Sequence, residues 1–256
     1  MLKKVLIILF WVLLAGYLFF AVAFTVKKTE ESLCTQIRIV VTDSAAYGFI
    51  RTADIYPLVS PFEDRLLGRP LHEINTRELE QVVRRYPPVA GAETYTTADG
   101  TLCVEVRQRI PILRVINRFQ ESFFLDSEGK ILTPVARYTP HVPVASGYID
   151  EKAREQEMLP ALFRLGTYIR NHPFWNAQIQ QIYVNEQQQL ELIPRAGNHT
   201  ILWGPPGDDE DKFERLEALY RNALNIQGWD TYSTINVQYR NQIVCTRRDT
   251  LMNHSL

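Results

Sequence analysis

The stretch that decides the fold of this chain is RYPPVAGAETYTTADGTLCVEVRQRIP, residues 85–111. Its double proline cannot continue a helix, so a helix that precedes it must end there. Two runs with the composition of β-strands, VAGAETYTT and TLCVEVRQR, flank Ala98-Asp99-Gly100, and Asp-Gly is a strong signal for a hairpin turn. The stretch therefore predicts two antiparallel strands that follow a helix.

The second of these strands alternates between two faces of a sheet. Leu102, Val104 and Val106 share one face, and Cys103 lies on the other. No His or Asp stands directly beside Cys103 to activate its thiol. The chain holds three cysteines without a C-x-x-C pair, so we predict three separate free thiols rather than a zinc site or a disulfide framework.

A helix is predicted just before the double proline. Asn75 or Thr76 is its N-cap, and residues 84–85, both arginines, lie in its last turn, where cations complement the helix dipole. The apolar stripe of this helix consists of Leu79, Val82 and Val83. The arginine pair is thus interpreted as a helix terminus and not as a phosphate clamp.

Two further elements precede that helix. The run QIRIVV, residues 36–41, has the alternation of a strand. The run ADIYPLV, residues 53–59, is predicted to be a helix that Thr52 caps and that Pro57 shortens or kinks. The predicted order over residues 34–109 is therefore strand, helix, helix, strand, strand.

The N-terminal region contains an uncharged apolar run at residues 5–26. About 22 helical residues reach about 33 Å, enough to cross a hydrocarbon core of about 30 Å. A signal peptide cleaved after Ala21-Val22-Ala23 is the alternative. Lysines flank the run on both sides, so the positive-inside rule leaves the orientation open.

Composition excludes several functional classes. The chain has 256 residues, enough for two modest domains, and its formal net charge is −1. No overall field draws such a chain to nucleic acid. Hydrophobic residues make up 46% and charged residues 22%, which is a globular balance. We expect a folded protein that binds no nucleic acid.

Short matches to catalytic and metal motifs have plainer structural interpretations. Ser127-x-x-Lys130 lacks the companion motifs of penicillin-binding enzymes, so a hairpin turn explains it better. The acids at residues 208–211 lack the ligand spacing of a calcium loop and suit the first turn of a helix. The histidines are scattered without metal-ligand spacing. We therefore predict no catalytic residues, no metal, no cofactor and no small-molecule substrate.

The C-terminal half is predicted to be a mixed α+β domain. Strand-like runs occur at residues 113–118, 122–125, 179–184, 189–194 and 199–204, with a turn at 126–129 and a proline-rich connector at 134–143. Helices are predicted at 151–171 and 211–225. The last helix buries Phe213, Leu216, Leu219, Tyr220 and Leu224, and the runs 234–240 and 242–247 are predicted to pair as strands.

The order and spacing of several marks resemble one bacterial family. The strand-helix-helix-strand-strand order is that of a POTRA module, and it follows directly after the apolar run. The marks are Gly68, Leu71, Pro88-Val89 and Arg109-Ile110-Pro111. Together they resemble the FtsQ/DivIB family of cell-division proteins, over nearly the whole chain. Gln108 stands where this family commonly has Glu.

The resemblance implies an α+β fold class with a single transmembrane helix, a POTRA domain and a mixed β domain with helices. It implies a cytoplasmic tail at residues 1–4, the span at 5–26, the POTRA domain at 34–109 and the β domain at 110–247. Residues 248–256 are expected to be a disordered tail. The globular part then faces the periplasm, and the protein is expected in the inner membrane at the division septum.

The resemblance also implies a function without catalysis. The expected role is that of a divisome scaffold that links early and late septal proteins and binds FtsB/FtsL-like coiled coils by β-augmentation. The expected partner-binding residues are Ile235, Val237, Tyr239, Arg240, Gln242, Ile243, Val244, Cys245 and Arg247. For Tyr239, Ile243 and Val244 the alternative is plain packing within the sheet.

Two other functional classes stay open at this point. One is a POTRA-containing envelope assembly or secretion factor, although no long series of barrel strands follows the module. The other is a signal-cleaved periplasmic enzyme, whose mature chain would start near Phe24.

Overall fold

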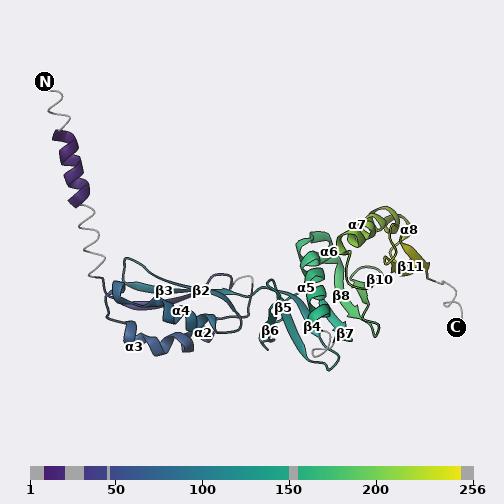
Figure 1. The fold of residues 1–256 in the computed structure, drawn as a ribbon, viewed down its shortest axis with the longest axis horizontal. Helices are drawn as coiled ribbons and strands as arrows, with labels where there is room; N and C mark the ends of the chain where they lie inside the picture. Colours follow the sequence, from purple (N-terminus) through teal and green to yellow (C-terminus); the bar gives the residue numbers. More distant parts are fainter. Residues whose placement is uncertain (1–8, 21–31, 45–46, 150–154, 249–256) are drawn as a thin grey trace, which may run out of the picture. The chain divides into compact units, whose positions relative to one another are not determined.

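The computed structural model describes residues 9–20, 32–44, 47–149 and 155–248. The chain divides into two compact units, Met1–Arg109 and Ile110–Leu256 (Figure 1). Residues 9–20 are helical. The predicted span 5–26 extends past this helix into residues outside the described ranges. Among the described residues, no helix combines the length and the apolar character needed to cross a membrane.

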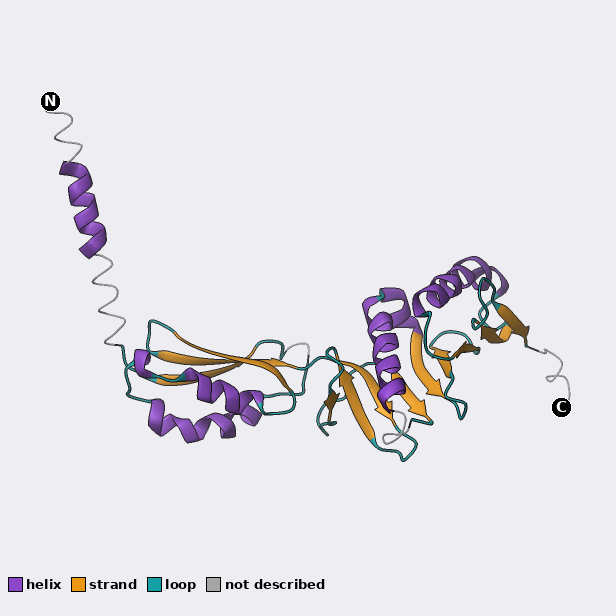
Figure 2. Ribbon diagram, viewed as in Figure 1, coloured by secondary structure: helices purple, strands orange, loops and turns teal. Residues whose placement is uncertain are grey.

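The first unit is a three-stranded sheet with helices on one side, as Figure 2 shows. The sheet order is β1-β3-β2, with β1 (Gln36–Val41) parallel and β2 (Val89–Thr96) antiparallel to the central β3 (Thr101–Gln108). The helical segments are α2 (Thr52–Val59), η1 (Ser60–Phe62), α3 (Glu63–Leu66), η2 (Leu71–Glu73) and α4 (Thr76–Arg84). The predicted order of strand, helix, helix, strand, strand is confirmed.

Helix α4 shows why the sequence folds this way locally. The Asn75 side chain accepts a hydrogen bond from the backbone N–H of Arg77 at 3.2 Å, so the predicted cap is confirmed. Leu79 and Val83 are buried against the sheet side. The Arg84 guanidinium donates twice to the Ala92 carbonyl, at 3.0 and 2.7 Å. The arginine therefore joins the helix end to β2.

The predicted cap of the first helix is wrong by one position. Thr52 is the first helical residue of α2, and Arg51 is the N-cap, whose backbone N–H donates to the Asp54 carboxylate at 2.8 Å. Pro57 lies inside α2 and does not stop it. Its ring removes one backbone donor, and the chain continues after Val59 through η1 into α3.

Gln108 occupies a buried position at the end of β3. Its side-chain amide donates to the Asp43 carboxylate at 3.2 Å and to the Tyr47 carbonyl at 3.0 Å, and its oxygen accepts from the Ile50 N–H at 2.7 Å. A Glu at position 108 would have no side-chain N–H to donate to Asp43 and Tyr47. The amide thus bridges β3 to the segment that leads into α2.

The second unit is built on a nine-stranded sheet with the order β12-β11-β10-β9-β8-β7-β4-β5-β6. Its strands are β4 (Pro111–Ile116), β5 (Ser122–Asp126), β6 (Ile131–Leu132), β7 (Val144–Gly147), β8 (Ile179–Val184), β9 (Leu190–Pro194), β10 (Thr200–Gly204), β11 (Tyr232–Asn236) and β12 (Val244–Arg247). Its helices are α5 (Glu155–Asn171), α6 (Pro173–Gln178), α7 (Asp209–Leu219), the π-helical η3 (Tyr220–Leu224) and α8 (Asn225–Gln227). Helices and strands bury one continuous apolar core.

Of the two long helices predicted in this unit, one needs correction. The predicted helix 211–225 is interrupted, because the chain widens into a π-helical turn at η3 before α8. Phe213, Leu216, Tyr220 and Leu224 are buried as predicted, whereas Leu219 is only partly buried. The predicted start of the other helix, residues 151–154, lies outside the described residues, and α5 is described from Glu155.

The turn glycine of the β2–β3 hairpin provides a test of the first unit. Gly100 has a φ of +87°, and a Cβ there would lie 2.6 Å from the Leu33 carbonyl oxygen. Gly68 has a φ of +75° but no atom within 4 Å of such a Cβ. Gly68→Ala should therefore cost about 1 kcal/mol of backbone strain, and Gly100→Ala should cost more, because a steric clash is added.

Two measurements test this prediction. Urea unfolding gives the free energy of unfolding of each variant, and hydrogen exchange of the native protein reports the stability of the β3 amides. Gly68→Ala is the matched control, since it carries the strain of positive φ without the clash. An equal loss of stability in both variants would contradict the close approach of Leu33 to the turn.

Candidate functional site at the open edge of the second sheet

Among the described residues, the last strand of the second sheet has a neighbouring strand on one side. β12 pairs antiparallel with β11, and no described strand lies on its other side. The Arg248 N–H donates to the Thr231 carbonyl at 3.0 Å. Since successive residues of an antiparallel strand alternate in direction, the backbone groups of Arg247 and Cys245 point away from β11. This edge therefore offers unpaired N–H and C=O groups.

The other edge of the same sheet is much shorter. It consists of β6, Ile131–Leu132, which pairs with β5 through Phe124 and Leu125. Two residues offer few backbone groups to an incoming chain. Within the described part of the second unit, β12 is the edge better suited to accept another strand.

The structure places the nine predicted partner-binding residues in three settings. Ile235 lies in β11, and Val244, Cys245 and Arg247 lie in β12. The remaining five lie in the connection between these strands: Val237, Tyr239, Arg240, Gln242 and Ile243. The prediction that residues 234–240 and 242–247 form two long strands is therefore wrong for this connection.

A local hydrogen bond explains the early end of β11. The Asn236 side chain accepts from the Gln238 N–H at 3.0 Å, a turn geometry that Asn favours. Asn241 has a φ of +60°, which a strand residue does not adopt. Strand β11 thus ends at Asn236, the Val237 N–H still donates to the Leu202 carbonyl of β10 at 3.1 Å, and β12 begins at Val244.

Exposure separates residues that can touch a partner from those that hold the sheet together. Ile235 and Val237 are fully buried in the core, and Cys245 is partly buried against it. Tyr239 and Val244 keep 51% and 47% of their surface exposed. The predicted set therefore contains core residues beside a smaller exposed group.

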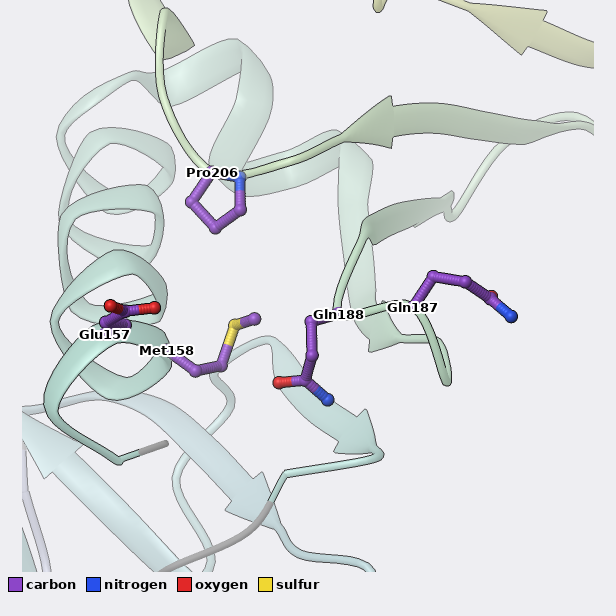
Figure 3. A pocket seen from close by; sticks show the side chains of 5 residues that line it. All are labelled: Glu157, Met158, Gln187, Gln188 and Pro206. Carbon is purple, nitrogen blue, oxygen red and sulfur yellow. The ribbon is translucent and has the colours of Figure 1, made fainter. Parts of the chain in front are cut away.

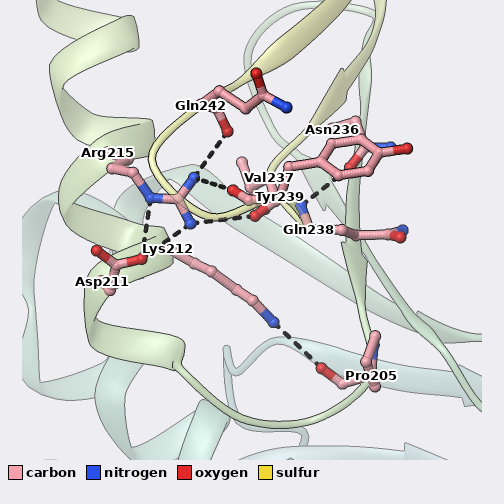
Figure 4. Close-up of polar contacts among 9 residues, drawn as sticks. All are labelled: Pro205, Asp211, Lys212, Arg215, Asn236, Val237, Gln238, Tyr239 and Gln242. Carbon is pink, nitrogen blue, oxygen red and sulfur yellow. Dashed lines mark hydrogen bonds and ion pairs between the residues drawn. The ribbon is translucent and has the colours of Figure 1, made fainter.

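One arginine of α7 joins the helix to the β11–β12 connection, as Figure 4 shows. Arg215 donates through Nη1 to the carbonyls of Tyr239 and Gln242, both at 2.8 Å, and through Nη2 to the Val237 carbonyl at 3.2 Å. Its Nε donates to the Asp211 carboxylate at 3.0 Å. Sequence reasoning missed this role, because the acceptors are backbone groups 22 to 27 residues away.

A second basic residue of α7, Lys212, contacts the loop that precedes this helix. Lys212 is buried, its Nζ donates to the Pro205 carbonyl at 3.2 Å, and it lies over the Trp203 ring. Burial lowers the pKa of Lys212, and the neighbouring aspartates oppose that shift. Asp209, one of the acids predicted for the first helical turn, accepts from the Trp203 indole N–H at 2.9 Å.

Aromatic packing holds α7 on the sheet. Phe213 lies 4.5 Å from Trp203 and 5.0 Å from Trp175, measured between ring centroids. Trp175 also contacts Tyr220 edge to face at 5.5 Å. All four rings are buried, and such pairs add to the free energy of burial. This packing therefore fixes the position of α7 and, with it, the positions of Lys212 and Arg215.

A buried polar pair completes this packing. His199 Nε2 and the Tyr220 hydroxyl lie 2.6 Å apart, and both side chains are buried. Burial lowers the pKa of His199, while the Trp229 backbone and Asp230 act in the opposite direction with smaller effect. The folded state therefore favours the neutral form of the His199 imidazole.

The described residues of the second unit form several surface hollows. Figure 3 shows one of about 320 Å³, lined by Glu157, Met158, Gln187, Gln188 and Pro206. It pairs no nucleophile with a base. The described residues contain no group of three or more side chains able to hold a metal ion. Burial raises the pKa of the Cys34 and Cys245 thiols, the opposite of what a nucleophilic thiolate needs.

The His199–Tyr220 pair predicts a pH dependence of stability. The unfolded imidazole titrates near pH 6.5, and the folded one only at lower pH. The stabilisation is therefore complete above about pH 6.5 and is lost as the pH falls toward the folded pKa, because only the unfolded state binds the proton in that range. Each unit of pKa difference corresponds to about 1.4 kcal/mol.

The measurement compares the free energy of unfolding of wild type and His199→Gln between pH 7.5 and about 5. The wild type should lose more stability than the variant across this range. His141→Gln, at an exposed histidine of the same unit, is the control and should behave as wild type. Parallel curves for wild type and His199→Gln would overturn the assignment.

The comparisons with known proteins agree with this architecture. A family model described as "FtsQ/DivIB, C-terminal related" matches residues 110–246, and a POTRA-like domain model matches residues 32–107. The cell division protein FtsQ of Rhodothermus marinus is 26% identical over 183 residues, which cover 69% of this chain and 67% of that protein. The first family model alone covers more than half of the 256 residues. The chain therefore belongs to the FtsQ/DivIB family of bacterial cell-division proteins.

Proposed function

We propose that this chain is a non-enzymatic, single-pass scaffold of the bacterial divisome that recruits a partner strand to β12. In this proposal residues 1–4 are cytoplasmic and residues 5–26 cross the inner membrane. Residues 34–109 form the POTRA domain, and residues 110–247 form the β domain in the periplasm at the septum. Family membership and the uncharged apolar run support this organisation.

The observation that carries the proposal is the open edge of the second sheet. The outward backbone groups of Cys245 and Arg247 match the donors and acceptors of an extended chain. An added strand satisfies them without any rearrangement of the core. The proposed partners are FtsB/FtsL-like coiled-coil proteins, each of which would place an extended segment along β12.

Charge around the edge indicates the chemistry of that segment. Arg240 and Arg247 are exposed and form no ion pair with any described residue. Tyr239 and Val244 add apolar surface beside them. An extended segment that carries acidic side chains near an apolar one fits this surface best, and its binding should weaken as salt screens the charges.

The test removes one outward backbone donor and leaves the remainder of the edge in place. Arg247→Pro deletes the outward N–H, and proline is tolerated on an edge strand where the N–H is not used within the sheet. Arg247→Ala is the matched control, because it deletes the same side-chain charge and keeps the N–H. Binding of the purified FtsB-like and FtsL-like proteins of the same cell is measured with the full chain in detergent.

We expect Arg247→Ala to weaken binding about threefold at low salt and less at high salt. Arg247→Pro should weaken it by a further factor of about ten, as expected for the loss of a backbone hydrogen bond at an interface. Circular dichroism and thermal unfolding should be alike for the two variants. Equal affinities of Arg247→Pro and Arg247→Ala would refute strand addition at this edge.

A further inference from the structure

The connection between β11 and β12 depends on side-chain donors. Residues 237–243 belong to no strand or helix, so the carbonyls along this segment lack the regular partners of a ladder. Arg215 alone supplies donors to three of them, at Val237, Tyr239 and Gln242. One side chain thus satisfies carbonyls at both the beginning and the end of the connection.

The geometry of Arg215 suits this role. Its guanidinium is a planar fork, so donors that leave in different directions are fixed relative to one another. The side chain is only 18% exposed, and Asp211 binds its remaining face at 3.0 Å. Bonds from a charged donor are stronger than those between neutral groups. Asp211 therefore fixes the guanidinium of Arg215, and the guanidinium in turn binds the carbonyls of the β11–β12 connection (Figure 4).

Besides its pairing with β11, the strand that follows the connection is held by partly buried Ile243 and Cys245 against the core and by a hydrogen bond from Ser233 to the Thr246 carbonyl. β12 spans only Val244–Arg247 and pairs with one neighbour, β11. A short strand with a single neighbour is marginal on its own. Helix α7, in contrast, is anchored by the buried side chains of Phe213 and Leu216, independently of Arg215. Loss of the fork should therefore loosen the connection and β12 without releasing the helix.

We propose that Arg215 is a positioning residue that forms the β12 edge in its binding conformation before a partner arrives. This inference rests on the proposed function, because it gives Arg215 a role in partner binding through the edge. Holding both ends of the connection at fixed spacing reduces the conformational freedom that β12 would otherwise lose on binding. Arg215 itself contributes nothing to partner contact in this account.

The test uses two substitutions and one matched control in the full chain. Arg215→Gln removes the charge and the fork, and Arg215→Lys keeps the charge but offers a single point donor. Arg221→Gln is the control, since Arg221 also lies on this helical segment and also pairs with an acid four residues before it, Glu217. Arg221 makes no described contact with residues 237–247.

The first measurement is hydrogen exchange of the partner-free chain. In Arg215→Gln, the amides of Val244 and Thr246 should exchange roughly tenfold faster, the loss expected for one charge-assisted hydrogen bond. Amides of α5 and β8 should keep their wild-type rates. Arg215→Lys should resemble Arg215→Gln, and Arg221→Gln should resemble wild type. Unchanged exchange at Val244 and Thr246 in Arg215→Gln would overturn the inference.

The second measurement is binding of the same FtsB-like and FtsL-like proteins used above. Arg215→Gln should bind roughly tenfold more weakly than Arg221→Gln. At saturating partner its β12 amides should regain wild-type protection, because the contacts with the partner are intact. Wild-type affinity despite fast β12 exchange would overturn the positioning role. The positioning role would also be overturned if the β12 amides of Arg215→Gln stayed unprotected at saturating partner concentration.

The two proposals fail in distinguishable ways. If Arg247→Pro is defective in binding while Arg215→Gln binds as wild type, the edge is the site and the role of Arg215 is refuted. If Arg247→Pro binds as well as Arg247→Ala, the edge itself is refuted, and the inference about Arg215 falls with it.

Discussion

The burial of Phe213 and Leu216 of α7, together with Tyr220 of η3, is the interaction on which the proposed partner-binding edge depends. β10 and β11 are parallel neighbours, so the chain between them must cross over, and α7 lies in that crossover. Phe213 and Tyr220 fix the helix among Trp175 and Trp203. The position of α7 then determines where β11 starts and where the connection to β12 can be held.

This dependence joins the core of the unit to its surface. The face of α7 that meets the core carries Phe213 and Leu216. Lys212 and Arg215 of the same helix donate to carbonyls of the loops that precede and follow it in the sequence. One element thus carries both the apolar contacts that stabilise the domain and the polar contacts that order its last strand. A partner strand that pairs with β12 would extend the sheet at a strand whose position depends on the packing of α7.

The edge also carries features that limit unselective pairing. β12 is short, and the connection and strand place Arg240 and Arg247 beside it. Short strands and charged side chains are the usual means by which proteins protect an open edge from aggregation. The same charges favour an acidic segment over a neutral one. Protection and selectivity therefore come from the same residues.

Local signals in the sequence were sufficient for much of the fold. The Asp99-Gly100 turn, the Asn75 cap and the stop at the double proline were all predicted, because each depends on backbone preferences of neighbouring residues. The pairing of β11 with β12 was predicted and is confirmed. The parallel pairing of β11 with β10 was not predicted, since it joins segments far apart in the sequence. The end of β11 at Asn236 was missed because a β-like run conceals an Asx turn. Arg215 looked like any helical arginine, since its acceptors are backbone carbonyls that leave no trace in the sequence.

The most direct test of the central claim follows the four β12 amides by hydrogen exchange with and without the FtsB-like partner. The N–H groups of Cys245 and Arg247 point away from β11, whereas those of Val244 and Thr246 already face it. Strand addition predicts a large gain of protection at Cys245 and Arg247 and little change at Val244 and Thr246. Binding that leaves Cys245 and Arg247 unprotected, with protection gained on another surface, would contradict it.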